Sequence, residues 1–155
     1  MPRRALIVEV PEAETVVLDG FAQPGVPPHV TILFPFVDGD ELDETAIAAL
    51  CSSHAPFAFE LDRVERFDDG VVWLHPEPSE PFAALTQAVW RQWPDHPPYE
   101  GAFDEVIPHL TISTVAVDVD IELPIPATAR EVTLIEEGTD GYWTRRRVFP
   151  LQGVA

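Results

Sequence analysis

Two short stretches of this chain, Pro-His-Val-Thr-Ile at residues 28–32 and Pro-His-Leu-Thr-Ile at residues 108–112, repeat each other almost letter for letter. Because alternate residues of a β-strand share a face, the His and Thr of each copy would lie on one face and the aliphatic residues on the other. Each stretch therefore predicts a strand that carries an imidazole and a hydroxyl on its open side and packs its apolar back on a core.

The sequence around the two stretches predicts an α+β domain. The strands expected from apolar and alternating patterns lie at residues 5–10, 29–34, 57–67, 71–75, 109–114, 130–135 and 142–151. Turn residues at 68–70 and 138–141 join the strands on either side of them. Helices are expected at residues 43–52, after acidic capping candidates, and at residues 80–93, which have apolar residues at helical spacing. Residues 115–129 are rich in Val, Asp and Pro and do not predict a full helix.

The two halves of the sequence resemble each other in their order of elements. Each runs from a motif strand through a connector to a strand, a turn and a returning strand. This weak internal duplication predicts two similar lobes, each built on an antiparallel sheet, that pack about a pseudo-two-fold axis. The motif strands would lie near the axis, and their polar pairs would face each other across a central cleft. We expect residues 1–155 to form this single bilobal domain.

The composition excludes several classes of function. A net charge of −18 and a pI of about 4.3 disfavour a protein that binds long RNA or DNA through a basic surface. All nine basic residues are Arg, which excludes a lysine nucleophile and the lysine of a P-loop. The single cysteine, Cys51, lies in an apolar helical segment and is expected to be buried and inert.

The location and the partners follow from the same features. The sequence has no apolar stretch long enough to cross a membrane, and its first ten residues lack the features of a signal peptide. We expect a cytoplasmic monomer that has no membrane partner and no long nucleic-acid partner. A small nucleotide or the end of an oligonucleotide remains compatible with the acidic surface.

The repeated motif resembles the signature of the two-histidine (2H) phosphoesterase superfamily, which includes the bacterial 2′-5′ RNA ligase and cyclic phosphodiesterase proteins. That signature is two His-x-Thr/Ser motifs, and His29-Val30-Thr31 and His109-Leu110-Thr111 match it 80 residues apart. The resemblance covers essentially the whole chain. It implies a bilobal α+β fold with antiparallel sheets around a central cleft. It also implies metal-independent chemistry on 2′,3′-cyclic phosphates, on 2′-5′ links or on related cyclic nucleotides.

These residue types suit the opening of a cyclic phosphate. A neutral and a protonated imidazole can act as base and acid near neutral pH, so His29 and His109 are the candidate catalytic pair. The sequence does not decide which of them is the base. Thr31 and Thr111 would donate hydrogen bonds to the non-bridging phosphate oxygens. No cofactor is expected, and no metal site is predicted, because the sequence has neither a cysteine cluster nor paired ligand spacing.

Three further residues are candidates for substrate binding. Arg145 could bind a second phosphate bidentately, although a solvated face that offsets nearby acids is the simpler interpretation of the run 145–147. By strand alternation, Arg145 and Arg147 would share a face, and Arg146 would lie opposite. Tyr99 and Tyr142 could stack a nucleobase, or pack within a loop or the core instead.

The sequence leaves three functions open. The first is a phosphoesterase that acts on small nucleotides or RNA ends through the two histidines. The second is a nucleotide-binding or regulatory module with little turnover. The third is reversible 2′-5′ RNA ligation, which the acidic surface disfavours. Turnover of a 2′,3′-cyclic mononucleotide in EDTA would separate the enzyme from the binding module.

Overall fold

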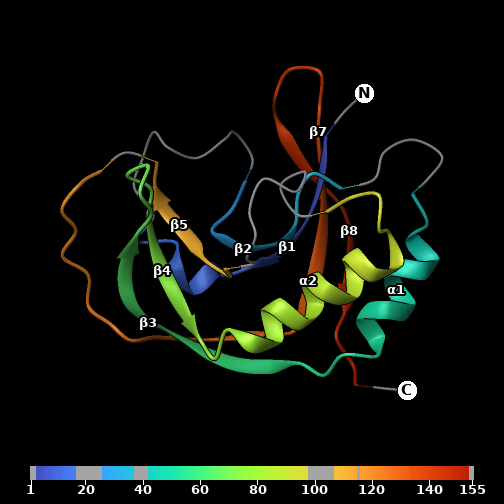
Figure 1. Ribbon diagram of the computed structural model, residues 1–155, viewed down its shortest axis with the longest axis horizontal. Helices are drawn as coiled ribbons and strands as arrows, with labels where there is room; N and C mark the ends of the chain where they lie inside the picture. Colours follow the sequence, from blue (N-terminus) through green and yellow to red (C-terminus); the bar gives the residue numbers. More distant parts are fainter. Residues whose placement is uncertain (1–2, 17–25, 37–41, 98–106, 115, 154–155) are drawn as a thin grey trace.

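Two four-stranded antiparallel sheets form the fold (Figure 1), with strand orders β2-β1-β7-β8 and β5-β4-β3-β6. The computed structural model describes residues 3–16, 26–36, 42–97, 107–114 and 116–153. The strands of the first sheet are β1 (Arg4–Glu9), β2 (His29–Leu33), β7 (Glu131–Glu137) and β8 (Trp143–Pro150). Those of the second are β3 (Phe57–Arg66), β4 (Val72–Glu77), β5 (Leu110–Ser113) and β6 (Ile125–Ala129). The expected α+β class with two antiparallel sheets is confirmed.

The helices in the described ranges are α1 (Glu44–Ser52), α2 (Glu80–Gln92) and a short 3₁₀ turn, η1 (Pro11–Ala13). The α1 helix begins where predicted, because the Asp43 carboxylate accepts a hydrogen bond from the backbone N–H of Ala46 at 3.0 Å. The α2 helix buries Phe82, Leu85 and Val89 of the predicted apolar face, whereas Trp93 is the C-cap residue and is partly buried. None of the described helices is long and apolar enough to cross a membrane.

One continuous core joins the back faces of the two sheets and the two helices. Val30 and Ile32 on β2, and Leu110 and Ile112 on β5, are at most 2% exposed, which confirms the apolar back of each motif strand. Helix α2 packs against β2, and α1 packs against β8 (Figure 1). Burial also raises the pKa of the Cys51 thiol to about 12, so the thiol stays protonated, consistent with the prediction that it is inert.

Strand β6 is not predicted by the sequence pattern. Its sequence, Ile-Pro-Ala-Thr-Ala, contains a proline, which argues against a strand in the middle of a sheet. The strand forms because β6 lies at the edge of its sheet and pairs only with β3. The N–H that Pro126 lacks is therefore tolerated there. The structure describes no helix within residues 116–129, as expected.

The two sheets are the two expected lobes, but each lobe takes strands from both halves of the sequence. The motif strand β2 of the first half shares its sheet with the β7–β8 hairpin of the second half. The motif strand β5 of the second half shares its sheet with the β3–β4 hairpin of the first half. Each motif strand still occupies one edge of its sheet, and β2 and β5 contact each other, so the two motifs do meet between the sheets.

Candidate active site

The two motif imidazoles are held in the same way. Nδ1 of His29 lies 2.7 Å from the carbonyl oxygen of Pro27, and Nδ1 of His109 lies 2.7 Å from the carbonyl oxygen of Ile107. Because a carbonyl oxygen only accepts, Nδ1 carries the proton of each neutral ring and donates it, which leaves a lone pair on Nε2. The acceptor comes from the residue two positions upstream in both motifs, so the repeat in sequence is also a repeat in space.

The motif histidines lie close enough to influence each other electrostatically. Burial lowers the pKa of His29, the hydrogen bond to Pro27 raises it, and a positive charge on His109 lowers it further. Burial also lowers the pKa of His109. Thr31 and Thr111 are partly buried and lie two residues after the histidines, so they share the strand faces of the imidazoles. The structure thus places His29, Thr31 and Thr111 on two strands that contact each other, and His109 immediately before the second of these strands.

A charged network lies beside His29. Glu9 is the neighbour of His29 across the β1–β2 pair. Its carboxylate accepts hydrogen bonds from Nε (2.9 Å) and Nη2 of Arg145 and from Oγ1 of Thr133 (2.9 Å). The hydrogen bond from Arg145 holds the pKa of Glu9 below its usual range, so Glu9 remains ionised and its charge raises the pKa of His29. This places Arg145, a predicted binding residue, on the face that carries His29.

Aromatic rings, in contrast, lie beside His109. Its imidazole meets the ring of Phe67 at a centroid distance of 5.1 Å and that of Trp73 at 5.8 Å. Trp73 is the neighbour of Thr111 across the β4–β5 pair, so it lies on the motif face of the second sheet. The two histidines are therefore equivalent in their backbone contacts and different in their wider surroundings.

The other arginines of the 145–147 run have structural partners. Arg146 and Arg147 both pair with Glu44, and Arg146 also reaches Glu136. The prediction that Arg145 and Arg147 share a face is wrong. The register of the β7–β8 pair shifts between Leu134, which is opposite Arg147, and Ile135, which is opposite Arg145. The two arginine side chains can therefore take opposite faces of the sheet. Arg146 and Arg147 therefore fit the simpler interpretation, in which exposed arginines offset the charge of nearby acidic residues.

The two predicted stacking residues are not brought to the histidines by the described structure. Tyr142 is 52% exposed at the β7–β8 turn, which lies at the end of the first sheet where β1 begins. His29 pairs with Glu9 at the opposite end of β1. Tyr99 lies outside the described residues.

Sequence reasoning missed Glu9 and Trp73 as site residues. The signal for Glu9 is a charged residue that interrupts an otherwise apolar first strand. The signal for Trp73 is its place on the strand that follows the 68–70 turn, but an aromatic residue there is equally typical of the core. Their relation to the motifs depends on which strands pair, and that is not visible in the sequence.

A second group of polar residues lies on β3 and β4. Ligand atoms of Asp62, His75 and Glu77 lie within 4.8 Å of one another, and Nδ1 of His75 is 2.8 Å from Oδ1 of Asp62. This group could hold a cation. The sequence reasoning missed it, because Asp62 reaches the group through a β-bulge between Leu61 and Arg63. None of its residues belongs to a His-x-Thr motif, and we assign it no role in the chemistry.

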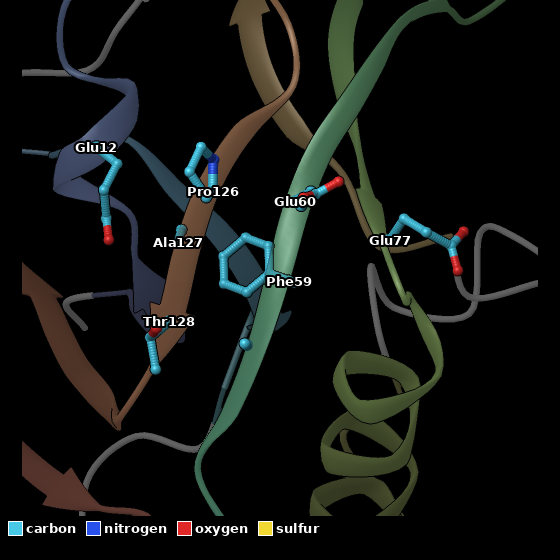
Figure 2. Close-up of a pocket in the computed structure, with 8 residues that line it drawn as sticks. Glu12, Phe59, Glu60, Glu77, Pro126, Ala127 and Thr128 are labelled. Atoms are coloured by element: carbon cyan, nitrogen blue, oxygen red, sulfur yellow. The ribbon is translucent and has the colours of Figure 1, made fainter.

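A pocket of about 420 Å³ lies at the β6 side of the second sheet (Figure 2). Its lining residues are Glu12, Ala58, Phe59, Glu60, Glu77, Pro126, Ala127 and Thr128. Three of these side chains are carboxylates, which disfavour an anionic ligand such as a phosphate. β6 and β5 are the opposite edges of this sheet, so the pocket is separate from the motif histidines.

Comparison with known proteins identifies similar sequences and folds. Residues 8–141 match the family model of the 2′-5′ RNA ligase superfamily. No curated protein sequence matches this chain significantly. The crystal structure of TT0787 of Thermus thermophilus is similar, with a TM-score of 0.67 and 20% identity over 99% of this chain and 100% of that chain. E. coli LigT complexed with 3′-AMP gives a TM-score of 0.66 and 19% identity over 97% and 99% of the two chains. LigT complexed with NADP+ gives 0.65 and 18% over 97% of each chain. The architecture is therefore that of LigT.

Proposed function

The chain belongs to the 2′-5′ RNA ligase superfamily, and we propose that it is a phosphoesterase of small nucleotides or RNA ends that carry a 2′,3′-cyclic phosphate or a 2′-5′ link. The observation that carries the proposal is the matched pair of His29, the first residue of β2, and His109, the residue before β5, because β2 and β5 contact each other. Each ring has its Nδ1 proton directed to a backbone carbonyl, which leaves Nε2 for proton transfer. The complexes of E. coli LigT with 3′-AMP and NADP+ support a nucleotide as the class of ligand.

The proposed reaction uses the two imidazoles in opposite protonation states. The neutral imidazole takes a proton from water while the water oxygen forms a bond to phosphorus. The bond between phosphorus and one ribose oxygen breaks, and the protonated imidazole gives its proton to that oxygen. The product is a nucleoside monophosphate, and proton exchange with solvent restores the starting states. The hydroxyls of Thr31 and Thr111 donate hydrogen bonds to the non-bridging oxygens, on which negative charge develops.

Hydrolysis in a chelator tests this proposal directly. We expect the purified protein to convert 2′,3′-cyclic mononucleotides to monophosphates at the same rate with and without EDTA, because no step above uses a metal. The products can be separated and quantified by ion-exchange chromatography. Binding of the nucleotide without turnover would contradict the proposal and support a binding module. Formation of 2′-5′-joined products in place of hydrolysis would contradict it in favour of ligation.

Arg145 is proposed to bind a second phosphate of the substrate. Glu9 engages Nε and Nη2, along one edge of the guanidinium, while the described residues accept no hydrogen bond from Nη1, although Glu131 also acts on this group electrostatically. The free edge can donate to a second anion near His29. Tyr142 would stack only on the base of a longer ligand, because it lies at the far end of the sheet.

Replacing Arg145 tests this assignment. We expect Arg145→Ala to raise KM about 10-fold for a 2′-5′-linked substrate with a second phosphate, because one charge-assisted hydrogen bond is lost. The value of kcat should change little. KM for a cyclic mononucleotide should stay nearly unchanged. Arg147→Ala is the matched control, because Arg147 binds Glu44 instead. The double variant Glu9→Gln/Arg145→Ala removes the carboxylate that Arg145→Ala leaves unpaired. An unchanged KM for both substrates would contradict the assignment.

A further inference from the structure

Trp73 is buried beside His109 with an unsatisfied polar atom. The residue is 6% exposed, and its indole Nε1 has no hydrogen-bond partner within the described part of the chain. A buried N–H without an acceptor destabilises the folded state, because it loses its hydrogen bond to water and gains none in return. A phenylalanine would avoid this cost and would still be apolar. What the indole adds over a phenylalanine ring at this position is its larger ring surface.

The ring contacts of Trp73 show what the indole provides. It stacks on Phe67 at a centroid distance of 4.8 Å and an interplanar angle of 24°, and it meets His109 at 5.8 Å and 68°. Phe67 meets the same imidazole at 5.1 Å and 88°. The two aromatic rings therefore form one wall, the Phe67–Trp73 wall, against which the His109 ring rests. The hydrogen bond from Nδ1 to Ile107 fixes the same ring at another point.

No such wall is described beside His29. The neighbour of His29 across its strand pair is Glu9, which is bound to Arg145 and Thr133. Ring contacts within the described residues involve His109 but not His29. The wall is thus a feature of one imidazole of the pair, and its effect can be measured against the other.

We propose that Trp73 is a positioning residue, which with Phe67 holds the His109 ring so that Nε2 points to the reacting phosphate. The inference rests on the proposed function and extends it, because the wall acts through His109 and not by contact with substrate. Misplacement of a catalytic group by about 1 Å can lower a rate by about 100-fold. A rigid wall beside the imidazole limits such displacement.

Kinetics provide the first test. We expect Trp73→Leu to lower kcat for a 2′,3′-cyclic mononucleotide by about 10- to 100-fold, with KM changed less than kcat. Trp73→Phe should give a smaller loss, because it keeps an aromatic ring beside His109. The Tm of Trp73→Phe should fall less than for a similar reduction in size at another core residue, because the substitution also removes the unsatisfied N–H. Trp93→Leu is the matched control, because Trp93 packs on Phe36 and not on His109.

The titration of the histidines by NMR provides a test that needs no turnover. Among the described residues, the groups around His109 that can carry charge are His29 on β2, and on β3 and β4 the pairs Glu65–Arg63 and His75–Asp62 beside Trp73. Trp73→Leu leaves all of these groups in place. Because burial lowers the pKa of His109, the variant should let water reach the ring and raise that pKa toward the usual value. The pKa of His29 should move less, and Trp93→Leu should move neither.

The outcomes separate the two proposals. An unchanged His109 titration in Trp73→Leu, or a loss of kcat no larger than that of Trp93→Leu, would overturn the positioning role. If Trp73→Leu does not fold, Phe67→Leu removes the other half of the wall at a partly exposed position and gives the same readouts. If the wild-type protein hydrolyses no cyclic nucleotide, the proposed function is refuted. A shift of the His109 titration in Trp73→Leu would still support the effect of the wall on His109.

Discussion

Replacing either His29 or His109 with Ala is expected to lower kcat for 2′,3′-cyclic nucleotides by about 10²–10⁴-fold, the range that one positioned acid or base contributes. Both imidazoles donate Nδ1–H to a backbone carbonyl, so each loss removes an Nε2 that no described neighbour can replace. The double variant should be little worse than either single variant, because a base without its acid cannot complete the transfer. Steady-state kinetics with one cyclic mononucleotide give kcat for the two single variants and the double variant.

A matched control and the pH dependence sharpen this prediction. His54→Ala removes a histidine that lies after α1, outside both motifs, and should leave kcat unchanged. Burial lowers the pKa of both motif histidines below the usual value of about 6.5. The protonated member of the pair becomes scarce as the pH rises through its lowered pKa, so activity should fall with increasing pH. We expect a bell-shaped profile of kcat/KM centred on the acid side of about pH 6.5. Full activity in either Ala variant would refute the acid–base pair.

Loss of either motif hydroxyl is expected to have the second largest effect. Thr31→Val and Thr111→Val should each lower kcat by about 10²–10³-fold, the cost of one donor that stabilises developing negative charge. Valine has nearly the shape of threonine and favours strands, so β2 and β5 should keep their structure. Because the hydroxyls act mainly in the transition state, kcat and kcat/KM should fall together.

The control for the hydroxyls is Thr128→Val. Thr128 lies on β6, the edge of the second sheet opposite β5, where the same change of side chain should leave kcat unaltered. Thermal unfolding of all three variants shows whether any loss of rate reflects a loss of folded protein. If Thr31→Val and Thr111→Val keep kcat within about 2-fold of the wild type, the hydroxyls do not stabilise the transition state.

Local pattern is sufficient to predict most elements and the four motif residues. The Asp43 cap, the apolar face of α2 and the apolar backs of β2 and β5 all depend on residues close in sequence, which periodicity reveals. The order of the strands depends on pairing between distant segments, such as β1 with β7, and no local pattern specifies it. The order of elements along the chain therefore predicts two similar sheets, but it does not reveal that each sheet takes strands from both halves.

The same limit applies to the residues around the histidines. Glu9 meets His29 and Arg145 through the pairing of β1 with β2 and through a long side-chain reach across the sheet. Trp73 meets His109 only because β4 pairs with β5. The opposite directions of Arg145 and Arg147 arise from a register shift, which strand alternation cannot anticipate. These features need the tertiary structure, whereas the repeated His-x-Thr motif does not.

The exchange of strands between the two halves determines when the first sheet can be completed during synthesis. β1 and β2 leave the ribosome before the other strands, but the second neighbour of β1 is β7, which is made after all strands of the second sheet. A nascent chain that has completed the second sheet therefore still has an unpaired edge on β1, although both motif histidines have been synthesised. The first sheet, which supports His29, becomes complete only when the β7–β8 hairpin is added. The activity proposed above therefore requires that this last hairpin be translated and folded.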